Sequence, residues 1–226
     1  MTDESVSADT APAPSDAAPV LEAEPAAASV LFGDQIETAR SFTNELARRG
    51  EELGLIGPLE LPRLWTRHIL NSALLAPLLE ARGRVADVGS GAGLPGLVLA
   101  IARPDVHFTL IEPMERRVDW LTSEASRLGL SNVTVVRGRA EDVSDDIVVD
   151  QVTARAVSAL SKLIPMTVPL VRSGGQLILM KGARVDDEIE KARKVILRQH
   201  LSDVEVLELG DGVVAETTRV FRATVD

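Results

Sequence analysis

Three alternating glycines behind a short apolar run are the residues of this sequence best suited to bind a cofactor. They stand in the segment Asp87-Val88-Gly89-Ser90-Gly91-Ala92-Gly93-Leu94. Glycines at this spacing let the chain turn sharply and approach a ligand closely, because they carry no Cβ. Pro95 then begins an apolar helical segment, whose free N–H groups and positive dipole end favour ligand binding. We therefore expect a cofactor crevice at the carboxyl end of a first parallel strand.

Two classes of cofactor compete for this loop. Residues 91–96 fit the G-x-G-x-x-G pattern of NAD-binding enzymes, and Glu112 stands where their ribose-binding acid is expected. However, the glycine run already starts at Gly89, and the charge of Asp87 would lie unfavourably close to a pyrophosphate. An acid there suits S-adenosylmethionine, whose amino-acid end carries an ammonium and a sulfonium. The loop favours S-adenosylmethionine, with an NAD-binding Rossmann enzyme as the alternative.

Polar residues also follow the next three predicted strands. Glu112 ends the second, where its carboxylate can accept hydrogen bonds from both ribose hydroxyls; a strand-end acid that faces water or caps the next helix is the alternative. Ala140 and Glu141 follow the third strand and fit an adenine pocket, against the alternative of an ordinary polar loop. Arg155 ends the fourth strand, where cofactor and substrate would meet. Since parallel strands end at one edge of a sheet, we expect these residues to form one site.

The elements that must position these residues alternate between strands and helices from Arg84 onward, the pattern of a parallel α/β sheet. Strands are predicted at about 84–88, 107–111, 133–136, 148–153 and 176–180. Two further strand-like runs, 204–209 and 213–224, flank the short turn Gly210-Asp211-Gly212 and predict an antiparallel hairpin. The expected fold is therefore α/β and Rossmann-like, with a mostly parallel sheet and a C-terminal hairpin.

The chain divides into three predicted regions. Residues 1–29 are rich in Ala and Pro and hold six Asp or Glu but no Lys or Arg, which predicts a disordered acidic tail. Residues 30–82 form an N-terminal helical extension, with one amphipathic helix over about 32–46 and a second over about 61–78. Residues 83–226 form the cofactor-binding domain.

Composition narrows the possible functions. A net charge of −10 disfavours a nucleic-acid partner, but the body beyond residue 29 holds 28 of the 34 acidic residues against 24 basic ones, which still permits a local basic face. The absence of cysteine excludes disulfides and thiolate metal sites and fits a reducing cytoplasm. The apolar runs are too short to span a bilayer, so no membrane contact is expected.

A family resemblance rests on three motifs together. These are Asp87-Val-Gly-Ser-Gly-Ala-Gly-Leu-Pro-Gly96, Arg67-His68-Ile69-Leu70 before it, and Lys181-Gly182 after the fifth strand. With these motifs the chain resembles the small-subunit ribosomal RNA methyltransferase G family, also called glucose-inhibited division protein B. The resemblance covers about residues 30–226. The resemblance implies a seven-stranded class I methyltransferase domain in the cytoplasm. It further implies methyl transfer from S-adenosylmethionine, leaving S-adenosylhomocysteine, to N7 of guanine 527 (rRNA numbering) in 16S rRNA.

The resemblance also implies site residues. Its cofactor-contacting places match Gly89, Leu94, Ala140, Glu141 and Arg155 in this sequence. The chain departs from the family at Asn71, where an Asp is usual, and at 54–58, where a Trp-Asn-rich segment is usual. Both departures fall in the N-terminal helices, so they concern RNA docking rather than the cofactor site.

Guanine N7 carries a free lone pair and loses no proton on methylation, so no catalytic acid–base residue is predicted.

Three residues are candidates for contact with RNA. Lys181 is the favoured contact to the RNA backbone; Arg67 binds phosphate or is simply solvated, and His68 is more consistent with a hydrogen-bonded structural residue. The expected partner is 16S rRNA or a small-subunit particle, without DNA, membrane or metal, and the chain is expected to be a monomer. The alternatives are a methyltransferase for a small molecule or protein, and a non-catalytic binding module.

Overall fold

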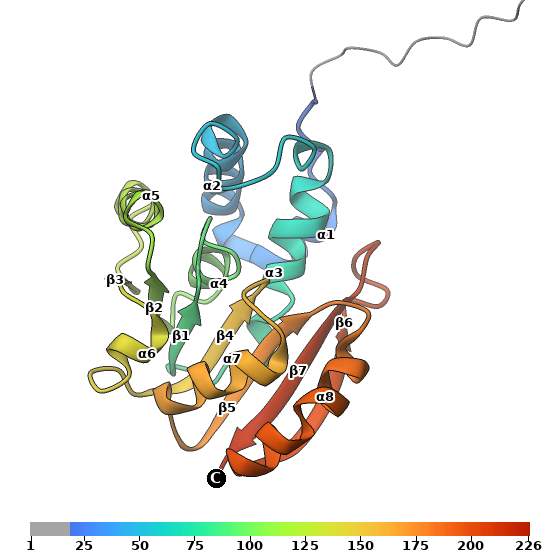
Figure 1. The fold of residues 1–226 in the computed structure, drawn as a ribbon. Helices are drawn as coiled ribbons and strands as arrows, with labels where there is room; N and C mark the ends of the chain where they lie inside the picture. Colours follow the sequence, from blue (N-terminus) through green and yellow to red (C-terminus); the bar gives the residue numbers. More distant parts are fainter. Residues whose placement is uncertain (1–18) are drawn as a thin grey trace, which may run out of the picture.

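The computed structural model describes residues 19–226, where one twisted sheet carries helices on both faces (Figure 1). The strands are β1 Arg84–Val88, β2 His107–Glu112, β3 Val133–Arg137, β4 Val149–Arg155, β5 Val171–Lys181, β6 Leu201–Leu209 and β7 Thr218–Val225. The helices are α1 Ala27–Phe32, α2 Ile36–Arg49, α3 Asn71–Ala73, α4 Gly96–Ala102, α5 Glu115–Arg127, α6 Ala140–Val143, α7 Leu160–Thr167 and α8 Val185–Arg198.

The strand order across the sheet is β3-β2-β1-β4-β5-β7-β6. The first five strands along the chain pair in parallel. Strand β7 is antiparallel to both β5 and β6. This confirms the expected α/β class, the mostly parallel seven-stranded sheet and the C-terminal hairpin. The strand order reverses at β1: the chain adds β2 and β3 on one side of β1 and then returns to add β4 on the other side. Sheets of this kind bind ligands at the carboxyl ends of the two strands where the order reverses.

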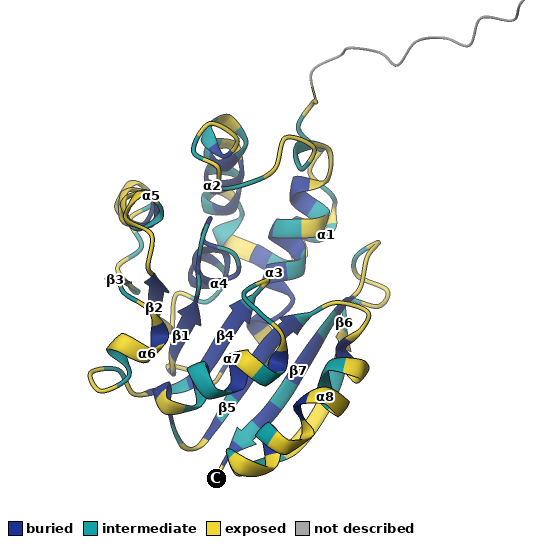
Figure 2. Ribbon diagram, viewed as in Figure 1, coloured by how far each residue is buried: buried dark blue, intermediate teal, exposed yellow. Residues whose placement is uncertain are grey.

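Two apolar layers sandwich the sheet, because successive side chains of a strand point to opposite faces. Val85 of β1 and Phe108 of β2 pack with helices α1 to α5. Ala86 and Val88 of β1 pack with helices α6 to α8 on the other face. Figure 2 shows the central strands mostly in dark blue, whereas the edge strands β3 and β6 have no buried residue and the outer sides of the helices are yellow. No helix within residues 19–226 is long and apolar enough to cross a membrane.

The N-terminal region is ordered earlier than predicted. Residues 1–18 of the expected tail lie outside the described part of the chain, but the boundary at 29 is wrong. The Glu22 carboxylate accepts hydrogen bonds from the backbone N–H of Thr66, at 3.0 Å, and from the Thr66 hydroxyl. The Glu22 N–H donates to the carbonyl of Leu61 at 2.9 Å. These contacts tie the segment before α1 to the body of the protein.

The second predicted helix, 61–78, is wrong as a single regular helix. It consists of a 3-10 turn at Leu61–Arg63, a π-helix at Leu64–Leu70, α3, and another 3-10 turn at Ala76–Leu78. Proline near the start of each 3-10 turn interrupts regular helical hydrogen bonding. The apolar periodicity nevertheless identified buried residues correctly, since Trp65 and Ile69 lie in the core.

The C-terminal hairpin also has a wider loop than predicted. The short turn Gly210-Asp211-Gly212 was expected to lead directly into a strand at 213, whereas β7 starts at Thr218. The carbonyl of Gly210 accepts hydrogen bonds from the N–H groups of Val213 and Val214, which curls this segment before the strand begins. The loop therefore extends over 210–217 and brings Glu216 and Thr217 to the ligand edge of the sheet.

Candidate active site

The glycine loop after β1 adopts a backbone conformation that only glycine accommodates easily. Gly89 and Gly93 have φ angles of +71° and +92°. A Cβ on Gly89 would lie 2.8 Å from Cγ2 of Val157, and one on Gly93 would lie 2.5 Å from Cδ1 of Leu97. Gly89 lines the cavity described below, whereas Gly93 packs against the Leu97 side chain of helix α4. The glycines thus serve two purposes, one at the ligand edge and one in packing.

Asp87 does not contact the cavity, which corrects the expectation that its charge meets a cofactor. The side chain lies on the α4 face of β1 and is fully buried. Its Oδ2 accepts a hydrogen bond from the N–H of Gly96 at 3.0 Å, and Oδ1 accepts one from the Thr153 hydroxyl at 3.2 Å. Burial raises the pKa of Asp87 to about 6. Asp87 therefore positions the glycine loop and the start of α4.

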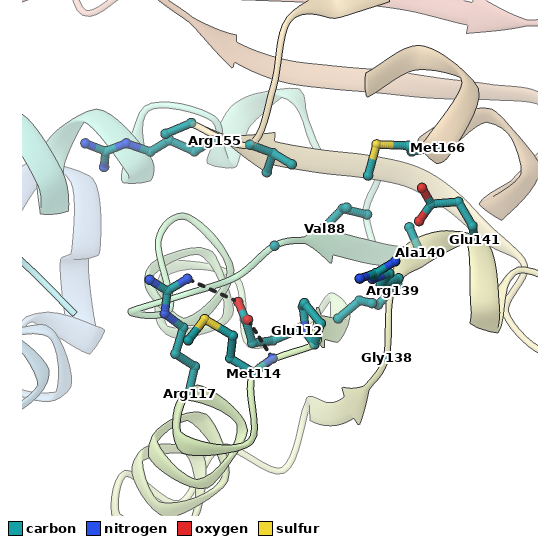
Figure 3. A pocket seen from close by; sticks show the side chains of 15 residues that line it. Val88, Glu112, Met114, Arg117, Gly138, Arg139, Ala140, Glu141, Arg155 and Met166 are labelled. Atoms are coloured by element: carbon teal, nitrogen blue, oxygen red, sulfur yellow. Dashed lines mark hydrogen bonds and ion pairs between the residues drawn. The ribbon is translucent and has the colours of Figure 1, made fainter. Parts of the chain in front are cut away.

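A cavity of about 490 Å³ lies at the carboxyl ends of β1 to β4 (Figure 3). The predicted residues that line it are Gly89, Glu112, Ala140, Glu141 and Arg155. The sequence did not identify the apolar and cationic residues that complete its wall, Val88, Met114, Arg117, Arg139, Val157 and Met166. The structure thus brings the four predicted strand ends together around one space.

Glu112 connects the glycine loop to this cavity. Its side chain is only 3% exposed. Oε2 accepts a hydrogen bond from the N–H of Gly91 at 2.9 Å, and Oε1 accepts one from the N–H of Met114 at 3.0 Å. The Nη1 atom of Arg117 lies 4.0 Å from Oε2, and Figure 3 shows both side chains at the cavity. Glu112 therefore fixes the glycine loop and the residue before helix α5, and it also forms part of the cavity wall.

Ala140 and Glu141 form the part of the wall that follows β3. Ala140 begins helix α6 and is 2% exposed, so its small side chain closes the wall without filling the cavity. The N–H of Gly138 donates to the Glu112 carbonyl at 3.2 Å, which fixes this loop against the end of β2. Glu141 and Arg139 add a carboxylate and a guanidinium beside it (Figure 3).

Arg155 ends β4 and points toward the N-terminal helices, because it is in phase with Thr153 on the Asp87 side of the sheet. Its Nη2 donates to the Arg67 carbonyl at 3.1 Å and to Nδ1 of His68 at 2.9 Å. Within residues 19–226 no carboxylate forms an ion pair with it. Burial lowers the pKa of Arg155 to about 10, so the guanidinium is still charged at neutral pH.

His68 holds Arg155 in place. Since Arg155 can only donate, Nδ1 of His68 is the acceptor, and the ring proton lies on Nε2. That nitrogen donates to Oε2 of Glu60 at 2.5 Å. Burial lowers the pKa of His68 and favours this neutral form. His68 also borders a recess of about 260 Å³ that includes Gly91 and Leu94 and shares Gly89, Arg117, Arg155 and Ala156 with the main cavity.

Lys181 is not a free cation for an RNA backbone, which corrects the sequence-based expectation. Its Nζ lies 2.7 Å from Oε2 of Glu188 and donates to the Ser158 carbonyl at 3.0 Å. The preceding residue Met180 faces the N-terminal helices, so Lys181 points to the opposite face, where α8 places Glu188. Only 9% of the Lys181 side chain is exposed. By contrast, 47% of the Arg67 side chain is exposed.

Comparison with known proteins identifies a family that this sequence matches over most of its length. The family model for GidB, rRNA small subunit methyltransferase G, matches residues 35–216. The chain is 63% identical to the ribosomal RNA small subunit methyltransferase G of Clavibacter michiganensis subsp. michiganensis, over 91% of this chain and 97% of that protein. It is 49% identical to the protein of the same name from Mycolicibacterium smegmatis, over 90% and 87% of the two chains.

Solved structures show the same fold at low sequence identity. The tRNA (m1A58) methyltransferase TrmI from Aquifex aeolicus aligns with a TM-score of 0.54 and 15% identity, over 69% of this chain and 68% of that chain. Aeropyrum pernix fibrillarin in complex with natively bound S-adenosyl-L-methionine aligns with a TM-score of 0.52 and 17% identity, over 70% and 75%. The sheet is therefore that of class I methyltransferases.

Proposed function

The chain belongs to the rRNA small subunit methyltransferase G family, and we propose that it transfers a methyl group from S-adenosylmethionine to N7 of guanine 527 (rRNA numbering) in 16S rRNA. The family and the fold support methylation of ribosomal RNA. They do not support the alternative of an NAD-binding Rossmann enzyme. The particular base and atom follow from the motif resemblance at Asp87–Gly96, Arg67–Leu70 and Lys181–Gly182. The observation that carries the proposal is the cavity at four adjacent strand ends, which is bounded by Arg155 on the substrate side.

The residues present fit S-adenosylmethionine. The loop at Gly89 leaves a space beside Val157 that a Cβ would fill. Glu112 is an acceptor at the end of β2, suited to ribose hydroxyls, and Ala140 and Glu141 lie where an adenine would follow. Gly91 and Leu94 border the recess beside Arg155, where the amino-acid end would lie. When bound, S-adenosylmethionine supplies a methyl group on a positively charged sulfur.

The chain's own residues need only bind, orient and exclude water in this reaction. Guanine N7 already carries a lone pair, so no residue has to remove a proton from it. Proximity and alignment of the two reactants supply much of the rate enhancement in such displacements. The buried guanidinium of Arg155, held by the Arg67 carbonyl and by His68, fixes the geometry of the boundary between cofactor and acceptor.

The partner in this proposal is 16S rRNA, free or within a small-subunit particle, and the protein acts as a cytoplasmic monomer. A base within a helix must be unstacked before N7 can reach the cofactor cavity. Arg67 at the surface is then the residue placed to contact the RNA near that base.

Reverse-transcription mapping of N7-methylguanine in 16S rRNA tests the proposal. A strain lacking the gene should lose one modified position, at guanine 527, and a plasmid with the wild-type gene should restore it. A Gly89→Ala gene should not restore it. Unchanged modification in the deletion strain, or loss at a different base, would contradict the proposed acceptor. Methyl transfer that survives ribonuclease treatment of the substrate would instead indicate a small-molecule or protein acceptor.

A further inference from the structure

A second cavity of about 360 Å³ lies at the carboxyl ends of β4 and β5, in the size range of small-ligand pockets. It is lined by Arg67, Asn71, Arg155, Ala156, Met180, Lys181, Gly182, Glu188, Glu216, Thr217 and Thr218. Arg155 and Ala156 also line the cofactor cavity. A ligand in the second cavity would therefore meet one in the first at these two residues.

Asn71 is the unusual residue of this cavity. Its Oδ1 atom is buried and has no hydrogen-bond partner within residues 19–226. A buried carbonyl oxygen without a donor is costly, and such groups in native proteins are normally paired. Asn71 follows directly after the π-helix that carries Arg67 and His68, and irregular helical turns of this kind are frequent at functional sites. Asn71 thus lines the cavity with an amide oxygen that has no donor within residues 19–226.

The charged groups around the cavity are only partly paired with one another. Lys181 and Glu188 form an ion pair with each other at 2.7 Å. Arg67 lies at the mouth, half exposed, with its Nε 3.9 Å from the nearest carboxylate oxygen, of Glu60. Arg155 also lines the cavity, and within residues 19–226 no carboxylate forms an ion pair with it. The uncharged acceptor of Asn71, together with the guanidinium groups of Arg155 and Arg67, can meet a nucleobase and the phosphate attached to it.

Resting on the proposed function, we propose that this second cavity takes the acceptor guanine and that Asn71 accepts a hydrogen bond from its exocyclic N2 amino group. Guanine carries N7 on one edge and N1–H and N2–H₂ on the opposite edge. With N7 at the boundary formed by Arg155 and Ala156, the amino group faces the remaining cavity, where Asn71 lies. Adenine has no amino group at that carbon, so Asn71 would be a specificity-determining residue for guanine. Flipped bases are commonly recognised through this edge.

The test compares guanine with inosine, which differs from guanosine only by lacking the N2 amino group. Small subunits from a strain without the enzyme are reconstituted with 16S rRNA carrying either base at the acceptor position, and kcat/KM is measured. Wild-type protein should methylate the inosine substrate about tenfold less efficiently, the effect of one buried hydrogen bond. Asn71→Leu should lose about tenfold on guanine and no longer distinguish the two substrates. Asn71→Asp keeps an oxygen acceptor and should keep the preference for guanine.

Two controls separate this inference from a general defect. Asn71 does not line the cofactor cavity, so Asn71→Leu should bind S-adenosylmethionine with the wild-type Kd. Ser158 has a buried, unpartnered hydroxyl that does not line the second cavity, and Ser158→Ala should leave kcat/KM and base preference unchanged.

The possible failures are distinguishable. If wild-type protein does not methylate the guanine-containing subunits at all, the proposed function fails. If it methylates them but treats inosine and guanine alike, or if Asn71→Leu keeps the wild-type preference, the assignment of Asn71 is wrong. If Asn71→Leu does not fold, Asn71→Ala takes its place, because it also lacks the acceptor and should lose the preference for guanine that the wild type and Asn71→Asp keep.

Discussion

The two halves of the sheet's ligand edge are built in different ways. Over β1 to β3, the site is formed mainly by a backbone loop that one carboxylate holds in place. The N–H of Gly91 donates to the carboxylate of Glu112, and the two residues are only 21 positions apart. Over β4 and β5, the site depends on side chains from distant segments, such as Arg155 bonded to His68, 87 residues apart. We infer that the proposed cofactor half is set by local sequence, whereas the proposed acceptor half requires the N-terminal helices to dock on the sheet.

The largest expected effect tests the backbone half. Gly89→Ala adds a Cβ at a φ of +71°, only 2.8 Å from Val157, in the wall of the cofactor cavity. We expect binding of S-adenosylmethionine, measured by calorimetry, to weaken by at least about 100-fold, or roughly 3 kcal/mol. Gly129→Ala is the matched control, because Gly129 has a φ of +66° but open space around its Cβ position. Equal losses in both variants would mean that backbone strain alone, and not the cavity, explains the effect.

Arg155→Met tests the side-chain half. The variant removes the hydrogen bonds to the Arg67 carbonyl and to His68, and we expect kcat/KM for methyl transfer to fall about 100-fold. The variant removes a buried charge but also leaves the Arg67 carbonyl and Nδ1 of His68 without this donor, so we expect only a small decrease in Tm. A Tm low enough to unfold the variant at the assay temperature would show that Arg155 acts mainly in folding.

The pH dependence of stability tests the position of Asp87. Its pKa is raised by burial from 3.8 to about 6 in the folded protein, so between these pH values the folded state holds a proton that the unfolded state has lost. The contribution of Asp87 to the free energy of unfolding therefore falls as pH rises from about 4 to 6, by on the order of 3 kcal/mol.

Asp87→Asn cannot titrate and should lack this component, which denaturant unfolding at several pH values would reveal. Other carboxylates, such as Asp150, have lowered pKa values and contribute the opposite slope, so the difference between the two proteins is the informative quantity. Identical slopes for variant and wild type would contradict a buried, charged Asp87.

The smallest expected effect concerns the link between His68 and Arg155. Burial lowers the pKa of His68, so the neutral ring dominates at neutral pH and is lost as pH falls through that lowered value. Protonation of Nδ1 removes the acceptor for Arg155 and should reduce kcat/KM about fivefold. His68→Asn should be reduced by a similar factor at neutral pH and should lack this acid-side decrease. A variant with the wild-type pH profile would exclude His68 as the group that titrates.

The same contrast explains what the sequence could predict. The strand ends, the parallel order and the cavity residues Gly89, Glu112 and Arg155 follow from local patterns, because each stands at the end of a recognisable strand. The direction of Asp87 and the pairing of Lys181 could not be predicted. Both depend on which helix covers which face of the sheet. A shift of one residue along a strand moves every side chain to the opposite face, so a small error in the strand boundary reverses the predicted direction.

Asn71 and Arg117 show a second limit. Asn71 was visible only as a departure from the family pattern, and nothing in the sequence indicated that its side chain would be buried without a partner. Arg117 lies in the first turn after Glu112 and reaches back to the cavity, but arginines are common on exposed helix faces. Their positions depend on packing between elements, which no local pattern records.

The most direct test of the account measures cofactor binding and methyl transfer in the same two variants. For Gly89→Ala and Asn71→Leu, calorimetry gives the Kd for S-adenosylmethionine, and labelled methyl transfer to small subunits gives kcat/KM. The account predicts that Gly89→Ala loses cofactor binding, while Asn71→Leu binds the cofactor normally and loses transfer to guanine. If Asn71→Leu instead loses cofactor binding, or if Gly89→Ala retains it, the division of the edge into cofactor and acceptor halves is contradicted.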